Sequence, residues 1–355
     1  MTQSINRIKN LNSQNDQRIV FVTLGMFIID EIHYTDGSSL YDVIGGGGTY
    51  AAYGARFFLP YPSSKGAGWI VDAGSDFPNE IRQTLFDLHT SLIFRTDHSR
   101  LTTRGWNKYG DNEFRAFKYT TTKKRIVSED IYSTDLLAAR SFHLICSPER
   151  ATELISDMLR QRAIELGADE PAPMIAWEPV PDLCTPEHLQ ACLDALKLVD
   201  IITPNAAEAA AFFGESEPTD KQTIERIGHR FVPYLKHHGA LIIRAGTLGC
   251  VILSSTVGTV WLDAYHLSSS QDKVVDPTGG GNCFIGGMSA GYVLSGGDVV
   301  EAAVYGNVAA SLAIEQVGVP NLIVTKSGNS NKHELWNGIN VFDRLREYKA
   351  RIGLK

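Results

Sequence analysis

The chain has 355 residues, of which 43% are hydrophobic and 21% are charged, and this balance excludes a globally disordered protein. Its 40 acidic side chains outnumber its 33 basic ones, and the net charge of -7 argues against a surface dedicated to nucleic acid. No apolar run approaches the ~20 residues of a membrane helix, and the polar N-terminus lacks the apolar core of a secretory signal. We therefore expect neither membrane insertion nor direct nucleic-acid binding.

The five cysteines are scattered and form neither a CxxC pair nor a zinc-binding spacing. This usage is typical of a reducing compartment, so we expect a cytoplasmic protein. Residues 1–17 are polar and predict a disordered tail, followed by a domain that spans residues 18–355.

Two β-rich excursions interrupt the first third of the chain. A β-rich run over residues 19–29 is followed, near residues 31–44, by β-branched and aromatic residues around an Asp-Gly turn, which predicts a hairpin. The glycine run Gly45–Gly48 then opens a helical pattern that stops at Pro60. A second β-rich stretch covers residues 92–121 and carries turn signals (YGDN) near its middle.

From Ser141 onward, short apolar runs alternate with helical patterns. Strands alternating with helices of this length predict βαβ units around a parallel sheet, in which ligands bind beyond the carboxyl ends of the strands. The predicted strands end in turn residues and read FHLICS, MIAWEPV, VDIITPN, ALIIRAG and KVVDPTG.

The segment VVDPTGGGNCFIGGMSAGYV, residues 274–293, carries the strongest chemical signal. We expect its strand to end at Asp276 and Gly279–Gly281 to lead directly into a helix. Glycines there let successive N–H groups form an anion nest, to which the helix N-terminus adds partial positive charge. The pattern suits a phosphate, although a tight strand-to-helix turn would also need glycines.

Rival motifs find no support. The string Gly287-Met-Ser289-Ala-Gly291 matches G-x-S-x-G of serine hydrolases, but Ser289 is predicted to lie inside a helix rather than at a strand-to-helix elbow. Neither G-x-G-x-x-G nor the P-loop pattern G-x-x-x-x-G-K-[ST] occurs.

With the glycine segment and several motifs in matching order, the chain resembles the ribokinase/PfkB family of carbohydrate and nucleoside kinases over residues 18–325. The strings GMFIIDEI and DPTGGGN are similar to those of a fungal subgroup, the yeast killer-virus maintenance proteins. The resemblance implies an α/β fold: a ribokinase-like three-layer sandwich with a central, mostly parallel sheet. A small β lid, made by the segments near 31–44 and 92–121, would cover the acceptor.

The resemblance also implies ATP and Mg²⁺ as cofactors and a small-molecule alcohol, sugar- or nucleoside-like, as acceptor. Gly279, Gly280 and Gly281 would stabilise the transferring phosphoryl group, and Thr278 would contact it. The remaining implied positions are Asp30, Gly46 and Gly47 for the acceptor, Asn205 and Glu208 (N-x-x-E) for water-mediated Mg²⁺, Arg244, Gly246 and Gly249 beside the nucleotide, and Asp276 in a monovalent-cation region.

Several of these positions also have a purely structural interpretation. Asp30 could end a strand in a turn, and Gly45–Gly48 could be a flexible turn. Asn205 with Glu208 has the pattern of a helix N-cap with a reciprocal glutamate, and this is compatible with a metal held through water by the same side chains.

One position departs from the family pattern. The last residue of the glycine turn, an aspartate that serves as base in the family, is Asn282 here. A neutral amide cannot take the proton, and general-base assistance is worth about 10²–10⁴ in rate. Phosphoryl transfer, however, rests mostly on positioning and charge stabilisation. Asn282 can still position a hydroxyl, and we expect Asn282→Asp to raise turnover if the acceptor pocket works.

Two functions therefore compete. The first is a PfkB-type ATP-dependent phosphotransferase with attenuated activity. The second is a catalytically silent, nucleotide- or sugar-binding pseudokinase that acts as a scaffold or regulator through a protein partner. The family also admits a homodimer formed through the lid.

Overall fold

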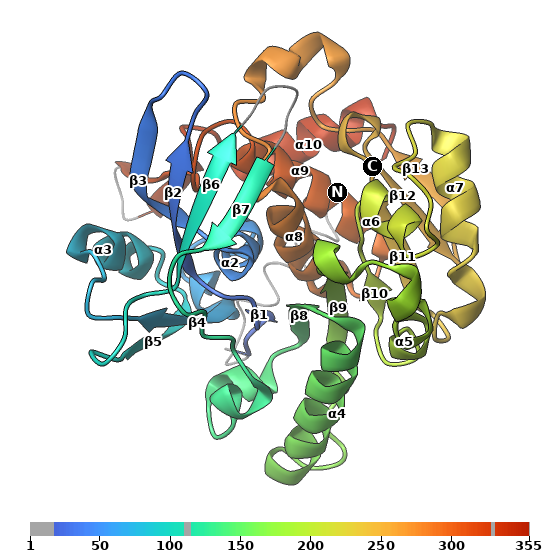
Figure 1. The fold of residues 1–355 in the computed structure, drawn as a ribbon, viewed down its shortest axis with the longest axis horizontal. Coiled ribbons are helices and arrows are strands. Elements are labelled where there is room, and N and C mark those ends of the chain that lie inside the picture. The colour runs from blue at the N-terminus through green and yellow to red at the C-terminus, as the bar shows by residue number, and fades with distance from the viewer. Residues whose placement is uncertain (1–17, 110–114, 328–330, 355) are drawn as a thin grey trace.

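The computed structural model describes residues 18–109, 115–327 and 331–354, which are built around a nine-stranded sheet (Figure 1). The strand order is β13-β12-β11-β10-β9-β8-β1-β4-β5, and neighbours from β11 to β5 pair in parallel while β12 and β13 are antiparallel. The strands are β1 (Phe21–Thr23), β4 (Ala67–Ala73), β5 (Ser91–Thr96), β8 (Ser141–Cys146), β9 (Met174–Pro179), β10 (Ile201–Ile202), β11 (Ala240–Arg244), β12 (Cys250–Ser254) and β13 (Gly258–Leu262). The predicted α/β class is confirmed.

Helices cover both faces of this sheet, because its strands bury alternate side chains in two separate cores. In β9, Met174 and Ala176 join one core and Ile175 and Trp177 the other, as expected where both faces are covered. The first core is closed by α2 (Gly47–Phe57), α3 (Asn79–Asp87), α8 (Gly280–Ser295), α9 (Val299–Ala313) and α10 (Val341–Arg351). The second is closed by α4 (Pro148–Glu165), α5 (Leu189–Ala195), α6 (Ala206–Ala211) and α7 (Lys221–His229).

A smaller four-stranded sheet, β3-β2-β6-β7, stands beside α2 and α8 (Figure 1). Its strands are β2 (Ile28–His33), β3 (Ser39–Gly45), β6 (Arg104–Tyr109) and β7 (Arg115–Tyr119). The hairpin predicted near residues 31–44 is confirmed, since β2 and β3 pair antiparallel across the Asp36–Gly37 turn. A separate hairpin of β14 (Leu322–Ser327) and β15 (Asn331–Trp336) precedes α10.

The second predicted lid segment, residues 92–121, was too long. Its first strand, β5, pairs with β4 at the edge of the central sheet, and only β6 and β7 belong to the small sheet. The reason is burial on both faces: Leu92 and Phe94 pack on one core and Ile93 on the other. Residues 110–112 of the predicted turn, like the predicted tail 1–17, lie outside the described residues.

The prediction of a strand ending at Asp276 was also wrong. A 3₁₀ helix, Ser268–Lys273, leads into an irregular segment, and Val275 is exposed. The N–H groups of Val275 and Asp276 both donate to the carbonyl of Ile314 at the end of α9, so no strand ladder forms there. Ser289 is fully buried inside α8, which confirms that the G-x-S-x-G match is not a nucleophile elbow.

Glycines let α2 and α8 pack almost backbone to backbone. A Cβ atom at Gly286 would lie 1.9 Å from the carbonyl oxygen of Ala51, and one at Gly54 would lie 2.2 Å from that of Cys283. Each helix is preceded by an N-cap glycine with positive φ, Gly46 before α2 and Gly279 before α8. Their close approach therefore brings the two glycine turns together.

Gly286→Ala should cost about 3 kcal/mol of unfolding free energy, because neither backbone can yield to the added methyl group. The matched control is Gly66→Ala, whose Cβ would meet only side-chain atoms, at 3.3 Å and beyond. Urea unfolding of both variants measures the difference, and equal losses would show that the helix contact is not tight.

Candidate active site

The glycine turn before α8 is held by a local hydrogen-bonded cap. Thr278 donates its N–H to the buried carboxylate of Asp276 at 2.9 Å, and its hydroxyl donates to the same oxygen. Gly279 follows in the left-handed region with φ of 77°, where a Cβ atom would lie 2.2 Å from the ring of Tyr50. Thr278 and Gly279–Gly281 therefore form a fixed turn at a helix N-terminus, a geometry suited to an anion.

A line of buried polar groups crosses β1, β8 and β9. The strand order reverses around β1, which has β4 on one side and β8 on the other, and ligands favour such points in α/β sheets. Thr23 Oγ1 lies 3.0 Å from His143 Nδ1, and His143 Nε2 lies 3.5 Å from Glu178 Oε2. Within the described residues, His143 Nε2 makes no hydrogen bond.

Glu178, at the carboxyl end of β9, is the centre of this network. Its Oε2 accepts a hydrogen bond from Asn282 Nδ2 at 2.6 Å, and its Oε1 lies 2.8 Å from Arg244 Nη2. Burial by itself raises the pKa of Glu178, but the Arg244 charge, with His143 and Asn282, brings that pKa below its ordinary value. Glu178 is therefore a buried carboxylate held in its charged form.

Arg244 joins Glu178 to the beginning of α6. Its Nη2 also lies 3.5 Å from Glu208 Oε2, and its Nη1 lies only 1.8 Å from where a Cβ of Gly281 would be. The guanidinium thus rests against the first turn of α8. Its Nε is buried and makes no hydrogen bond to any described residue, whereas Nη1 is the guanidinium nitrogen that lies at the glycine turn, where it suits an anion.

Asn205 and Glu208 form a reciprocal cap on α6. Asn205 Oδ1 accepts from the N–H of Glu208 at 2.7 Å, and Glu208 Oε2 accepts from the N–H of Asn205 at 2.8 Å. Burial raises the pKa of Glu208 to about 7; the Arg244 charge opposes that rise and Glu178 adds to it. The capping interpretation is confirmed.

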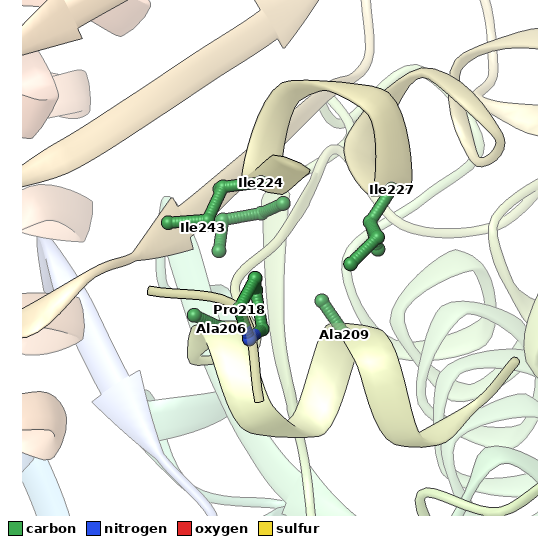
Figure 2. A pocket seen from close by; sticks show the side chains of 6 residues that line it. All are labelled: Ala206, Ala209, Pro218, Ile224, Ile227 and Ile243. Atoms are coloured by element: carbon green, nitrogen blue, oxygen red, sulfur yellow. The ribbon is translucent and has the colours of Figure 1, made fainter. Parts of the chain in front are cut away.

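The opposite side of α6 is packed into the core. Ala206 and Ala209 point toward Ile224 and Ile227 of α7 and Ile243 of β11, around a small, wholly apolar pocket (Figure 2). With no polar lining side chain, this pocket is a packing feature. The packing fixes the direction in which α6 presents its N-terminal cap.

The side chains near Glu208 fit a mode of magnesium binding in which the ion keeps several waters. Among the residues that the structure describes, no three His, Cys, Asp or Glu side chains gather as a metal site. Mg²⁺ usually keeps several waters and takes one or two carboxylates plus substrate phosphates. Glu208, capped by Asn205 and near the glycine turn through Arg244, supplies a carboxylate of that kind.

The turn that borders the predicted nucleotide position also depends on glycine. Gly246 and Gly249 both have positive φ, 55° and 89°. A Cβ at Gly249 would lie 2.0 Å from the carbonyl oxygen of Leu262, whereas one at Gly246 would meet nothing within 4 Å. Gly249 is required by the β11–β12 connection, and Gly246 leaves open space beside it.

Asp30 lies inside β2 of the small sheet, so the interpretation that it ends a strand in a turn was wrong. Asn107 Nδ2 of β6 donates to its Oδ1 at 3.0 Å. Gly45 and Gly105 flank the carboxylate closely: their Cβ atoms would lie 1.9 Å from Oδ2 and 2.6 Å from Oδ1. Two glycines on neighbouring strands thus make room for a nearly buried carboxylate.

The glycine turn before α2 connects the small sheet to the polar network. Gly46 has a φ of 96°, and its Cβ would lie 2.4 Å from the carbonyl oxygen of Met26. A Cβ at Gly47 would lie 3.1 Å from Asn282 Nδ2. The predicted acceptor turn and the predicted base position therefore lie side by side.

Glu178, His143 and Asn107 were not predicted as site residues. Glu178 had a usable signal, because it is a carboxylate at the carboxyl end of a predicted parallel strand. His143 interrupts the apolar run FHLICS, a weaker signal. Nothing local to Asn107 indicates its contact with Asp30, which depends on how β6 pairs with β2.

An α/β sheet with a small accessory sheet, and a glycine turn facing a buried ion-pair network, define the ribokinase class of folds. Residues 107–326 match the pfkB family carbohydrate kinases, and the chain belongs to that family. It is 38% identical to an uncharacterized Schizosaccharomyces pombe protein, over 93% of this chain and 92% of the relative. It is 37% identical to Protein MAK32 of Saccharomyces cerevisiae, over 98% and 96% of the two chains.

Solved structures share the fold at low identity. Ribokinase from Giardia lamblia superposes with a TM-score of 0.68 at 16% identity, covering 94% of this chain and 99% of that one. An E. coli protein described as a ribokinase II, in complex with ATP and Mg²⁺, gives 0.61 at 19% identity, covering 84% and 94%. No helix within the described ranges is long and apolar enough to cross a membrane.

Arg244→Gln should cost about 3 kcal/mol of unfolding free energy, because it leaves the buried Glu178 carboxylate without its cation. Arg244 keeps the pKa of Glu178 below the ordinary 4.5, and without Arg244 burial raises that pKa above the unfolded value. The variant's native state then binds more protons than its unfolded state, so the deficit should be larger at about pH 8 than at about pH 5.

The matched control is Arg346→Gln, since Arg346 is 66% exposed and pairs with Asp343 on the surface of α10. Its cost should stay well below 1 kcal/mol at either pH. A deficit for Arg244→Gln that does not grow with pH would contradict the assigned charge on Glu178.

Proposed function

We propose that this chain is an ATP-dependent phosphotransferase of the PfkB type that acts on the hydroxyl of a sugar- or nucleoside-like alcohol. The observation that carries the proposal is the meeting of two turns. Gly47, in the predicted acceptor turn, lies against Asn282 in the first turn of α8, directly after the predicted phosphate turn Gly279–Gly281. An acceptor hydroxyl and a terminal phosphate bound at these turns would be neighbours.

In this proposal the chain's own groups divide the work between two substrates. Asp30, positioned by Asn107, accepts hydrogen bonds from acceptor hydroxyls beside Gly46 and Gly47. The N–H groups of Gly279 and Gly281, with the guanidinium of Arg244, neutralise charge on the transferring phosphoryl group. Gly280, whose N–H donates to the carbonyl of Pro277, and Thr278, whose donors go to Asp276, fix the shape of that turn. Gly246 leaves room for the nucleotide, and Gly249 holds that turn in place.

Glu208 and Asn205 would hold Mg²⁺ through water, and the ion would offset the charge of the nucleotide's phosphates. The structure of the E. coli relative in complex with ATP and Mg²⁺ supports the choice of cofactors. A monovalent cation near Asp276, a homodimer, a protein partner and a cytoplasmic location stay predictions.

A second function, a pseudokinase that binds nucleotide or sugar and acts as a scaffold or regulator, is favoured by Asn282 alone. Removing the carboxylate from the base position weakens proton acceptance there while sparing every phosphate-binding group. The two functions differ in one measurable property: the pseudokinase binds Mg·ATP without acceptor-dependent ADP formation.

The test is acceptor-dependent ADP release from Mg·ATP over a panel of sugars and nucleosides. With an active acceptor, Asp30→Asn should lower kcat/KM for the acceptor by about 10²-fold, because buried hydrogen bonds to a charged group are each worth about 1.5–3 kcal/mol. Calorimetric Mg·ATP affinity should not change.

The control Asp36→Asn alters an exposed carboxylate in the turn of the same small sheet and should leave both quantities unchanged. Loss of Mg·ATP binding in Asp30→Asn would remove Asp30 from the acceptor site. Mg·ATP binding by the native chain with no acceptor turnover would favour the pseudokinase.

A further inference from the structure

Asn282, which occupies the family's base position, is hydrogen-bonded to a buried carboxylate, that of Glu178. Its Nδ2 lies 2.6 Å from Glu178 Oε2, and the side chain of Glu178 is 7% exposed. We propose that Glu178 is the group that accepts the acceptor's proton in this chain, with Asn282 orienting it. This inference rests on the phosphotransferase function proposed above.

Glu178 lies close to both turns, with Asn282 between it and the acceptor turn. Through Asn282 it is linked to Gly47 of the acceptor turn, and its Oε1 lies 3.8 Å from where a Cβ of Gly281 would be. The carboxylate therefore lies beside the proposed phosphate turn and one side chain away from the proposed acceptor turn. We expect Glu178 to take the proton directly or through one water, the two routes open to a general base.

The presence of Glu178 explains why an amide, and not an acid, suits position 282. A carboxylate can only accept, so Asn282 must present its NH₂ group to Glu178, which leaves the amide oxygen as a hydrogen-bond acceptor. An aspartate at position 282 would place a second carboxylate about as close to Glu178, and two carboxylates in contact cannot both stay ionised. Asparagine is thus the residue that lets Glu178 keep its charge.

The groups around the Glu178–Asn282 pair suit a charged carboxylate at Glu178. Arg244 lies on its Oε1, and His143 Nε2, buried and without a hydrogen bond in the described structure, lies 3.5 Å from its Oε2. His143 is itself fixed by Thr23. A carboxylate needed only to neutralise Arg244 would not require the amide of Asn282 on its second oxygen.

In the proposed step, the acceptor hydroxyl loses its proton to Glu178, and its oxygen forms a bond to the γ-phosphorus of the nucleoside triphosphate. The bond from that phosphorus to the β–γ bridging oxygen breaks, and its electron pair leaves with the nucleoside diphosphate. Glu178 returns the proton to water after the phosphorylated product has left.

Exchanging the acid and the amide between positions 178 and 282 tests the assignment. Glu178→Gln should lower kcat by about 10²-fold or more, with the acceptor KM much less affected. Asn282→Asp alone should give no rise, contrary to the expectation from the sequence, because the two carboxylates would share a proton. The double variant Glu178→Gln with Asn282→Asp keeps one acid and one amide and should recover at least about tenfold over Glu178→Gln.

The matched control is Glu334→Gln. Glu334 lies in β15 of the β14–β15 hairpin, its side chain is also 7% exposed, and its carboxylate pairs with the buried Arg56 of α2. The kcat of this variant should equal that of the native chain in the folded fraction. Thermal unfolding and Mg·ATP calorimetry on every variant separate loss of folding or nucleotide binding from loss of proton transfer.

Each outcome supports or overturns the assignment of Glu178 as the proton acceptor. Full kcat in folded Glu178→Gln, or no recovery in the folded double variant, overturns the assignment while the phosphotransferase function stands. If Glu178→Gln does not fold, a rise of about tenfold or more in Asn282→Asp would overturn it, and no rise would support it. A native chain that binds Mg·ATP but turns over no acceptor overturns the proposed function and this inference together.

Discussion

The arrangement of the candidate active site depends on the buried ion pair between Glu178 and Arg244. It joins β9 to β11, and through its partners it also reaches the beginnings of α6 and α8. Burying two charges is costly, and such a pair is often no more stabilising than apolar residues of the same volume. The presence of this pair beside the glycine turn is therefore better explained by the chemistry of the proposed site than by stability.

The glycines around this ion pair allow neighbouring groups to pack closely; they are not needed for flexibility. Gly286 and Gly54 let α2 and α8 approach until backbone meets backbone, and this approach brings Gly47 to Asn282. On the other side, the missing side chain of Gly281 is what admits Arg244 to the glycine turn. One packing constraint thus brings together the predicted acceptor turn, the predicted phosphate turn and the guanidinium of Arg244.

Much of the fold was predictable, because alternating strands and helices have periodicities that single residues rarely disturb. The capping pair Asn205 and Glu208 was predictable for the same reason: the pattern is local. The errors arose where tertiary contacts decide. Val274 and Val275 were predicted to lie in a strand, yet the N–H of Val274 donates to the carbonyl of Gln271 and that of Val275 to the carbonyl of Ile314 at the end of α9. Likewise, β5 (Ser91–Thr96) pairs with β4 of the central sheet and not with the small sheet.

The site was predicted only in the parts that a motif carries. Asn282 was identified as a departure, but the carboxylate that faces it lies 104 positions earlier in the chain, and no spacing connects the two. Asp30 and Asn107 are likewise joined by strand pairing alone. Contacts between residues far apart in sequence depend on how the strands and helices are arranged. That arrangement is determined by the whole sequence and not by any local pattern of residues.

The loss of an acid from the base position is not by itself a sign of lost catalysis. What matters for proton transfer is whether a charged carboxylate remains within reach of the hydroxyl, whichever strand or helix carries it. Here the asparagine donates to such a carboxylate, and a second acid at its position would neutralise one of the two. The pair Glu178 and Asn282 has the same formal charge and the same two functional groups as a pair with the acid and the amide exchanged. A pseudoenzyme inferred from Asn282 alone would overlook that equivalence, which only the folded chain reveals.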